Sequence, residues 1–140
     1  MSEERIDAER RADATVSLQL DKNPLSARMA RKAMQRLLGD DPPIMFVRDA
    51  MLLTSELVSN AVMHTDNGCE LIATYRSAPD WLRVEVRDLS SELPRRAESA
   101  DPATPRRGGL GLRLIDQMAA HWGASPRSEG GKTVWFEMAT

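Results

Sequence analysis

The stretch MLLTSELVSNAVMHT, residues 51–65, carries a strong helical pattern together with polar residues that the pattern does not explain. With its lead-in, this stretch predicts one helix over residues 44–65, because its apolar residues recur at the spacing of a helix face. The residues that share this broad apolar arc are Phe46, Val47, Ala50, Leu53, Leu57, Val58, Ala61 and Val62. We expect the arc to face the core of the protein.

Glu56 and Asn60 stand four residues apart in this helix, so they lie on one stripe at the edge of the apolar arc. His64 continues that stripe by one more turn. A carboxylate and a carboxamide at the border of core and solvent can hold a hard cation such as Mg²⁺, which takes oxygen ligands and keeps several waters. The alternative interpretation is an ordinary solvated helix edge. Features further along the chain are needed to decide between the two.

Length and composition bound the possible classes. With 140 residues the chain is expected to form one domain over residues 14–140, preceded by a flexible charged tail over residues 1–13. The net charge is −2 and the 19 basic residues are spread along the chain, so we expect no direct binding of nucleic acid. No apolar run has the length of a signal peptide or membrane span, and we therefore expect a cytoplasmic protein without a membrane partner.

The single cysteine, Cys69, cannot form a disulfide within the chain. It stands at the beginning of an expected strand, where a packed small residue is the more usual role than a reactive thiol.

The N-terminal part predicts a strand over residues 14–20, where apolar residues alternate, and then a first helix. Asn23 is expected to cap this helix, Pro24 to take its first position, and Gly39 to close it. The predicted buried stripe consists of Leu25, Met29, Ala33, Met34 and Leu37 or Leu38. The basic residues on the other side are Arg28, Arg31, Lys32 and Arg36. They form either a solvated face or a docking face for an acidic partner.

Further strands are predicted over residues 69–76 and 81–87 after the turn signal at residues 66–68, and over residues 122–128 and 132–138 near the C-terminus. The regular alternation of apolar and charged residues in the second of these strands predicts an antiparallel sheet with one solvated face.

Residues 89–107 have no periodicity and contain three prolines, so they are expected to form a long loop, with a possible lid over residues 89–108. The glycine-rich run over residues 106–112 follows and is expected to open a helix whose stripe is Leu114, Ile115, Met118 and Ala119.

Three features now combine into one chemical pattern: the Glu56–Asn60 stripe, Asp88 at a strand end, and the glycine run before a helix. An aspartate at a strand end can accept a hydrogen bond from an exocyclic amine and so select adenine. Glycine-rich backbone at a helix N-terminus suits phosphate, and Arg106 and Arg107 add positive charge beside it. Each feature alone has a structural alternative, namely a solvated carboxylate, a cap or a glycine hinge.

In this order the features resemble the motifs of the GHKL ATPase superfamily. Residues 56–64, ELVSNAVMH, resemble its N-box; residues 88–94, DLSSELP, resemble its first glycine box; and residues 109–112, GLGL, resemble its second. Residues 131–136, GKTVWF, resemble the late strand that carries the threonine of the family. The resemblance covers residues 14–138 and is closest to the small branch that includes anti-sigma factor serine kinases.

The resemblance implies a Bergerat-type α+β fold, a two-layer sandwich in which helices back a mixed, mostly antiparallel sheet. ATP and Mg²⁺ would bind between the central helix and the lid. Carried over by position, Asn60 would bind Mg²⁺ and Glu56 would activate the attacking water or serine hydroxyl. The remaining expected nucleotide contacts are Asp88 and Thr133 at adenine, Ser90 in the first glycine box, and Arg107, Gly109, Leu110, Gly111 and Leu112 at the phosphates.

Two positions in these motifs carry a further qualification. His64 either supports the metal and phosphate site or fills space. Ser90 stands where the family pattern has glycine, so its side chain would crowd the base or change the backbone angles of the loop.

Two functional hypotheses follow from the resemblance. The first is an ATP-dependent anti-sigma factor that binds a sigma factor and phosphorylates a serine of an anti-anti-sigma-like antagonist, possible as a homodimer. The second is a non-catalytic binding module in which nucleotide only shapes the lid or is not bound. The intact Glu56 and Asn60 favour the first hypothesis, and Ser90 favours the second.

Overall fold

The computed structural model describes residues 13–63, 67–88, 107–128 and 130–140. The elements in chain order are β1 (Ala14–Leu20), α2 (Ser26–Leu38), α3 (Ile44–Met63), β2 (Cys69–Arg76), β3 (Trp81–Asp88), α4 (Arg107–Met118), β4 (His121–Pro126) and β5 (Lys132–Ala139). None of the helices in these ranges combines the length and apolar character that crossing a membrane requires.

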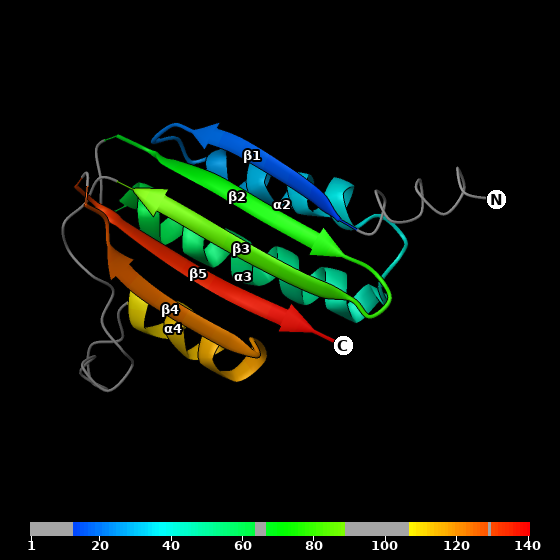
Figure 1. Ribbon diagram of the computed structural model, residues 1–140. Coiled ribbons are helices and arrows are strands. Elements are labelled where there is room, and N and C mark those ends of the chain that lie inside the picture. Colours follow the sequence, from blue (N-terminus) through cyan, green and yellow to red (C-terminus); the bar gives the residue numbers. More distant parts are fainter. Residues whose placement is uncertain (1–12, 64–66, 89–106, 129) are drawn as a thin grey trace.

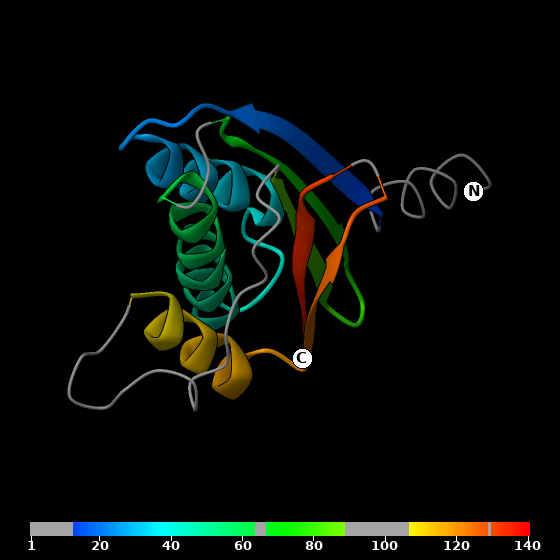
Figure 2. The same cartoon turned by 90° about the vertical axis from the view of Figure 1, so that its left-hand side faces the viewer.

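The five strands form one antiparallel sheet with the order β1-β2-β3-β5-β4. The helices α2, α3 and α4 lie side by side on one face of this sheet, and the other face carries none of the described helices (Figures 1 and 2). This arrangement confirms the predicted α+β sandwich, with the difference that every strand pair is antiparallel.

The core lies between the sheet and the helix layer because residues on β2, β3 and β5 alternate strictly between buried and partly exposed positions. The central helix α3 supplies the opposite wall and packs against α2, α4, β2 and β3. The largest fully buried side chains include Tyr75, Phe136, Met34, Leu38, Leu53, Leu71, Leu82 and Ile115. Tyr75 keeps its hydroxyl satisfied by donating a hydrogen bond of 2.6 Å to Asp80.

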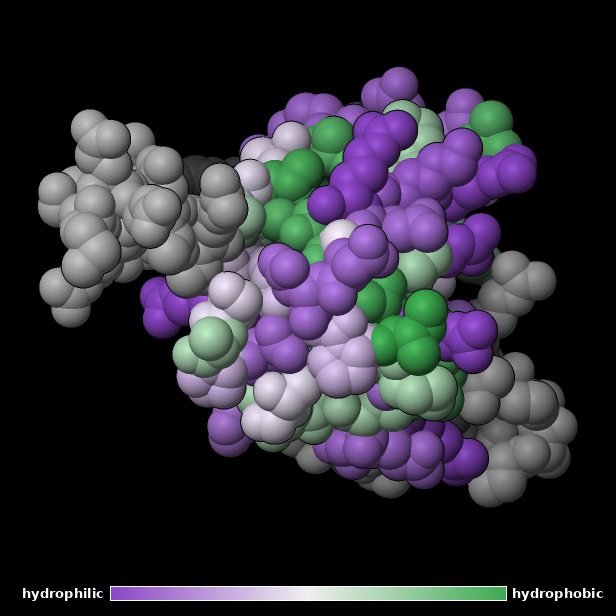
Figure 3. Space-filling model, turned by 90° about the vertical axis from the view of Figure 1, so that its right-hand side faces the viewer, coloured by the Kyte–Doolittle hydropathy of each residue, from purple (hydrophilic) through white to green (hydrophobic). Residues whose placement is uncertain are grey.

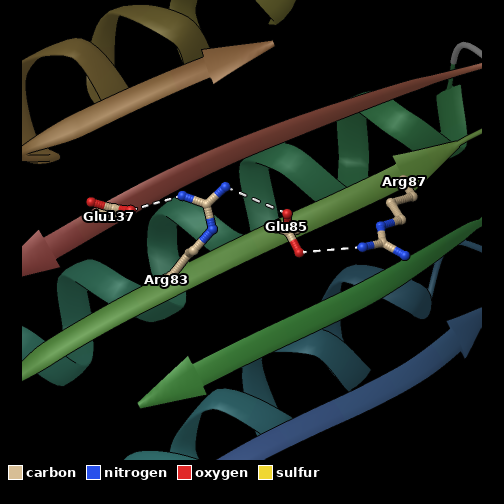
Figure 4. A network of polar contacts seen from close by, with 4 residues as sticks. All are labelled: Arg83, Glu85, Arg87 and Glu137. Atoms are coloured by element: carbon tan, nitrogen blue, oxygen red, sulfur yellow. Dashed lines mark hydrogen bonds and ion pairs between the residues drawn. The ribbon is translucent and has the colours of Figure 1, made fainter. Parts of the chain in front are cut away.

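The open face of the sheet carries a network of ion pairs (Figure 4). Arg83 lies 2.7 Å from Glu137 and 3.5 Å from Glu85, and Arg87 approaches Glu85 from its other side at 3.6 Å. The guanidinium of Arg83 also stacks 4.3 Å above the ring of Trp135. This is the solvated face that the alternation in β3 predicts.

The first helix differs from its sequence prediction at its beginning. Asn23 accepts a hydrogen bond of 2.8 Å from the amide of Leu25, but the helix starts only at Ser26, and Pro24 lies outside it. Leu25 and Met29 were predicted to be buried, yet they are 55% and 52% exposed. The buried residues of α2 are Ser26, Ala30, Ala33, Met34 and Leu38. Gly39 closes the helix with a positive φ of 57°, as predicted.

The helix α4 begins at Arg107, so the glycine run lies inside its first turns instead of preceding them. Glycine is a poor helix former, which is why the sequence alone predicts a later start. The end of α3, the end of β3 and the beginning of α4 nevertheless lie at the same end of the molecule (Figure 1). The motif-bearing segments are thereby brought to one end of the sandwich.

Candidate functional site

Glu56 and Asn60 occupy the second half of α3, one turn apart on the same side of the helix. Both side chains are half-buried, whereas their neighbours Leu53 and Leu57 belong to the core. The predicted position of this pair, at the border of the core, is therefore the observed one. Their oxygen atoms can serve a hard cation that keeps part of its water shell.

Asp88 is the last residue of β3 and lies on the core face of the sheet. In the strand register it stands between Cys69 of β2 and Lys132 of β5. The ammonium of Lys132 lies 3.2 Å from Oδ2 and 3.5 Å from Oδ1 of Asp88, and the side chains are 8% and 1% exposed. The carboxylate expected to hold the base is thus already engaged by a buried cation.

Cys69 is buried beside this pair, as predicted for a packed residue. Burial, and to a smaller extent the negative charge of Asp88, together raise the pKa of its thiol from 9.0 to about 12. The raised pKa disfavours the thiolate, so this position suits a packed residue better than a reactive thiol.

Thr133, predicted to act near adenine, lies on the face of the sheet opposite to Asp88. It pairs with Arg87 in the strand register, and the alternation of β5 places it on the open face, opposite to the face of Asp88. Lys132 is the residue that faces Asp88, and sequence reasoning missed it. The signal was available, because Val134, Phe136 and Met138 form the apolar alternation of β5, and Lys132 continues it.

The phosphate-binding residues expected in the second glycine box lie in the first turns of α4. These residues are Arg107, Gly109, Leu110, Gly111 and Leu112. The first turn of a helix leaves backbone N–H groups without an intrahelical partner, which suits an anion. The helix packs against α3 and β4, and its beginning lies at the same end of the molecule as the end of α3 (Figure 1). Residues 1–12, His64, Ser90, Arg106 and the rest of the predicted lid over residues 89–106 lie outside the described residues.

The residues present fit a magnesium nucleotide at one end of the site. Within the described ranges there is no group of three or more His, Cys, Asp or Glu side chains that would hold a metal on its own. Mg²⁺ does not need one when phosphates supply most of its ligands, since one or two protein oxygens then suffice. Asn60 and Glu56 can provide such oxygens, and the carboxylate of Asp88 is the kind of acceptor that an exocyclic amine of a base needs.

A second surface lies between β1 and α2, away from this site. It is an open groove of about 400 Å³ lined by Val16, Leu18, Met29, Lys32, Ala33, Arg36 and Leu37. Near the top of Figure 3, apolar atoms gather between strongly hydrophilic side chains. β1 is an edge strand, so one side of its backbone is not used in the sheet.

Comparison with known proteins is consistent with this geometry. A search among curated proteins finds no significant match to the chain. The family model described as the histidine kinase-like ATPase domain matches residues 20–138, which run from the end of β1 to β5 and include both the α3 stripe and Asp88. This family implies ATP binding, usually with Mg²⁺. The chain therefore belongs to the family of histidine kinase-like ATPase domains.

Proposed function

We propose that this protein is an ATP-binding regulator that acts as an anti-sigma factor with serine kinase activity. It would bind a sigma factor and phosphorylate a serine of an antagonist protein. The observation that carries the proposal is the half-buried pair Glu56–Asn60 in the second half of α3. The end of this helix lies at the same end of the molecule as the end of β3, whose last residue is Asp88 (Figure 1). Phosphoryl transfer needs little more than positioned groups, a metal ion and charge neutralisation.

In this proposal the amide oxygen of Asn60 holds Mg²⁺, which neutralises phosphate charge when bound. Glu56 accepts the proton of the serine hydroxyl while the serine oxygen forms a bond to the γ-phosphorus of ATP. ADP leaves with the electron pair of the bond between the γ-phosphorus and the bridging oxygen. The half-buried position of Glu56 supports this role, because the carboxylate remains reachable for a substrate hydroxyl.

The test separates binding from transfer. Partners are captured from a lysate of the cells that produce the protein and identified by mass spectrometry, and each is then incubated with the protein and γ-labelled ATP. Asn60→Ala is expected to weaken Mg²⁺-dependent ATP binding in calorimetry. Glu56→Gln is expected to bind ATP normally and to lose transfer by a factor of about 10² to 10⁴. Full transfer by Glu56→Gln would show that Glu56 is not the base, and Arg48→Ala, an exposed change at the other end of α3, is the control.

The second candidate is a non-catalytic module that switches partners, in which nucleotide only changes the shape of the lid. The ion pair between Lys132 and Asp88 favours it, because the base-binding carboxylate is engaged. Under this hypothesis Glu56→Gln would leave partner exchange unchanged, and no labelled phosphate would reach any captured protein. The homodimer implied by the resemblance is tested by light scattering of the same samples.

The groove between β1 and α2 is the surface we assign to a protein partner. Lys32 and Arg36 flank an apolar floor, so the matching partner is a segment with apolar residues bordered by Asp or Glu. Lys32→Glu combined with Arg36→Glu is expected to abolish capture of that partner while ATP binding is kept. Arg48→Glu, which makes half this change of charge at another exposed helix position, should capture the partner normally.

A further inference from the structure

Lys132 contacts the carboxylate of Asp88, the same group that is predicted to bind the amine of adenine. An ammonium only donates hydrogen bonds, and a carboxylate only accepts them. The exocyclic amine of adenine is also a donor, so the base and Lys132 seek the same acceptor. Lys132 spans both oxygens of Asp88, at 3.2 and 3.5 Å.

Burial makes this competition exclusive. The side chain of Asp88 is only 1% exposed, so its oxygens have almost no contact with solvent in this arrangement. A carboxylate in water could accept from several donors at once, because its two oxygens offer about four lone-pair positions. Here a base can reach the carboxylate only if the ammonium moves away.

The position of Lys132 allows such a movement. It is the first residue of β5, directly after Gly130 and Gly131, whose φ angles of 98° and 82° form the turn from β4. The backbone of this turn is held by hydrogen bonds from Arg127 to Gly131 and from Gly130 to Arg127. Lysine has a flexible four-carbon stem, so its ammonium can leave the carboxylate without a change in that backbone.

We propose that Lys132 is an internal competitor of the nucleotide base, which holds Asp88 in the free protein and must be displaced when adenine binds. This inference rests on the proposed binding of ATP at this site. It makes Lys132 a determinant of nucleotide affinity and base recognition, in the place where sequence reasoning expected Thr133 to act.

The affinity for ATP provides a test whose sign is decisive. Simple electrostatics predicts that loss of a lysine weakens the binding of an anion such as ATP. Competition predicts the opposite, because the variant no longer has to displace the ammonium. We expect Lys132→Met to bind Mg-ATP at least tenfold more tightly than the natural protein in titration calorimetry. Lys132→Arg keeps a cation at Asp88, so its affinity for Mg-ATP should stay as low as that of the natural protein. Arg31→Met is the control for the loss of one exposed positive charge.

Tripolyphosphate separates the base from the phosphates. It lacks a base, so Lys132→Met should bind it no more tightly than the natural protein does. If Lys132→Met binds ATP equally or less tightly than the natural protein, the competitor role is overturned. If tripolyphosphate gains as much as ATP, it is also overturned. If none of the proteins binds ATP, the proposed function itself fails, and this inference fails with it.

Amine labelling provides a second readout that needs no variant. The chain has three lysines, of which Lys22 and Lys32 are exposed and serve as internal references. Acetylation followed by mass spectrometry should find Lys132 slow to react in the free protein and faster with saturating Mg-ATP. Unchanged or slower labelling of Lys132 with ATP, at constant labelling of the references, would mean that the ammonium is not displaced.

Discussion

Asp88 and Lys132 are expected to be coupled more strongly than any ion pair on the open sheet face, although their contact is longer. Removal of one partner of a buried pair costs about 3–5 kcal/mol, because the remaining charge is left buried without compensation. Folded domains are stable by only about 5–15 kcal/mol, so Asp88→Asn and Lys132→Met should each remove a large share. The double variant leaves no orphaned charge and should lose far less than the sum.

Urea unfolding of the four proteins measures this coupling. With an m-value of about 2 kcal/mol/M, each single change should lower the midpoint by about 1.5 M or more. The matched control is the same cycle on Arg83 and Glu137, which are 2.7 Å apart but 31% and 22% exposed. Exposed pairs couple by about 1 kcal/mol or less. The reasoning is refuted if the losses at Asp88 and Lys132 add within about 0.5 kcal/mol, or if the exposed pair couples more strongly.

Three further changes test the packing around the site by chemical or thermal unfolding. Gly68 has a φ of 74°, and a Cβ there would lie 2.1 Å from the carbonyl oxygen of Leu20. Gly68→Ala should therefore lower the free energy of unfolding by at least about 1–3 kcal/mol. An unchanged unfolding midpoint would contradict this. The hydroxyl of Thr54 is buried and has no hydrogen-bond partner, so the isosteric change Thr54→Val should raise the free energy of unfolding by about 1 kcal/mol. A lower free energy of unfolding in this variant would mean that the hydroxyl makes a hydrogen bond. The pKa of Cys69 is raised from 9.0 to about 12 in the folded protein, so above pH 9 the thiol of the unfolded protein loses its proton first. The free energy of unfolding should then fall by up to about 1.4 kcal/mol per pH unit. The free energy of unfolding of Cys69→Ala should fall less steeply, and parallel curves for the two proteins would rule out this contribution.

The fold was largely predictable because its elements carry clean periodicities. The strands predicted over residues 14–20 and 69–76 are those that the sheet uses, and the strand predicted over residues 81–87 is longer by one residue, Asp88. The apolar arc of α3 marks the wall of the core. These patterns are local, and the tertiary packing buries, fully or partly, the same residues that the patterns predict to be buried. The position of the Glu56–Asn60 stripe follows from the same local regularity, since a spacing of four residues always places two side chains on one side of a helix.

The wrong predictions arise where the local sequence pattern is weak, or where the packing of neighbouring elements determines which residues are buried. Leu25 and Met29 share an apolar stripe in sequence, but α2 is the outermost helix beside the edge strand β1, and its core contact is made by Ala30 and Met34. Which of two apolar stripes is buried depends on what lies opposite, and the sequence of one helix does not contain that information. The start of α4 was missed for a different reason, because glycine propensity argues against a helix that tertiary packing permits.

The base end of the site turns on a shift of a single residue. In a strand, neighbouring side chains point to opposite faces, so Lys132 lies on the face of Asp88, whereas Thr133, the residue predicted to act at adenine, lies on the other face. Val134, Phe136 and Met138 are all buried, and the same parity carries Lys132 into the core. A lysine at such a position requires a buried partner, and the strand register leaves Asp88 directly across from it. The chemistry of the two residues could therefore have been paired from sequence, had the alternation been followed one residue further. Because that pairing occupies the acceptor expected to select adenine, the register of β5 bears directly on how this domain binds its nucleotide.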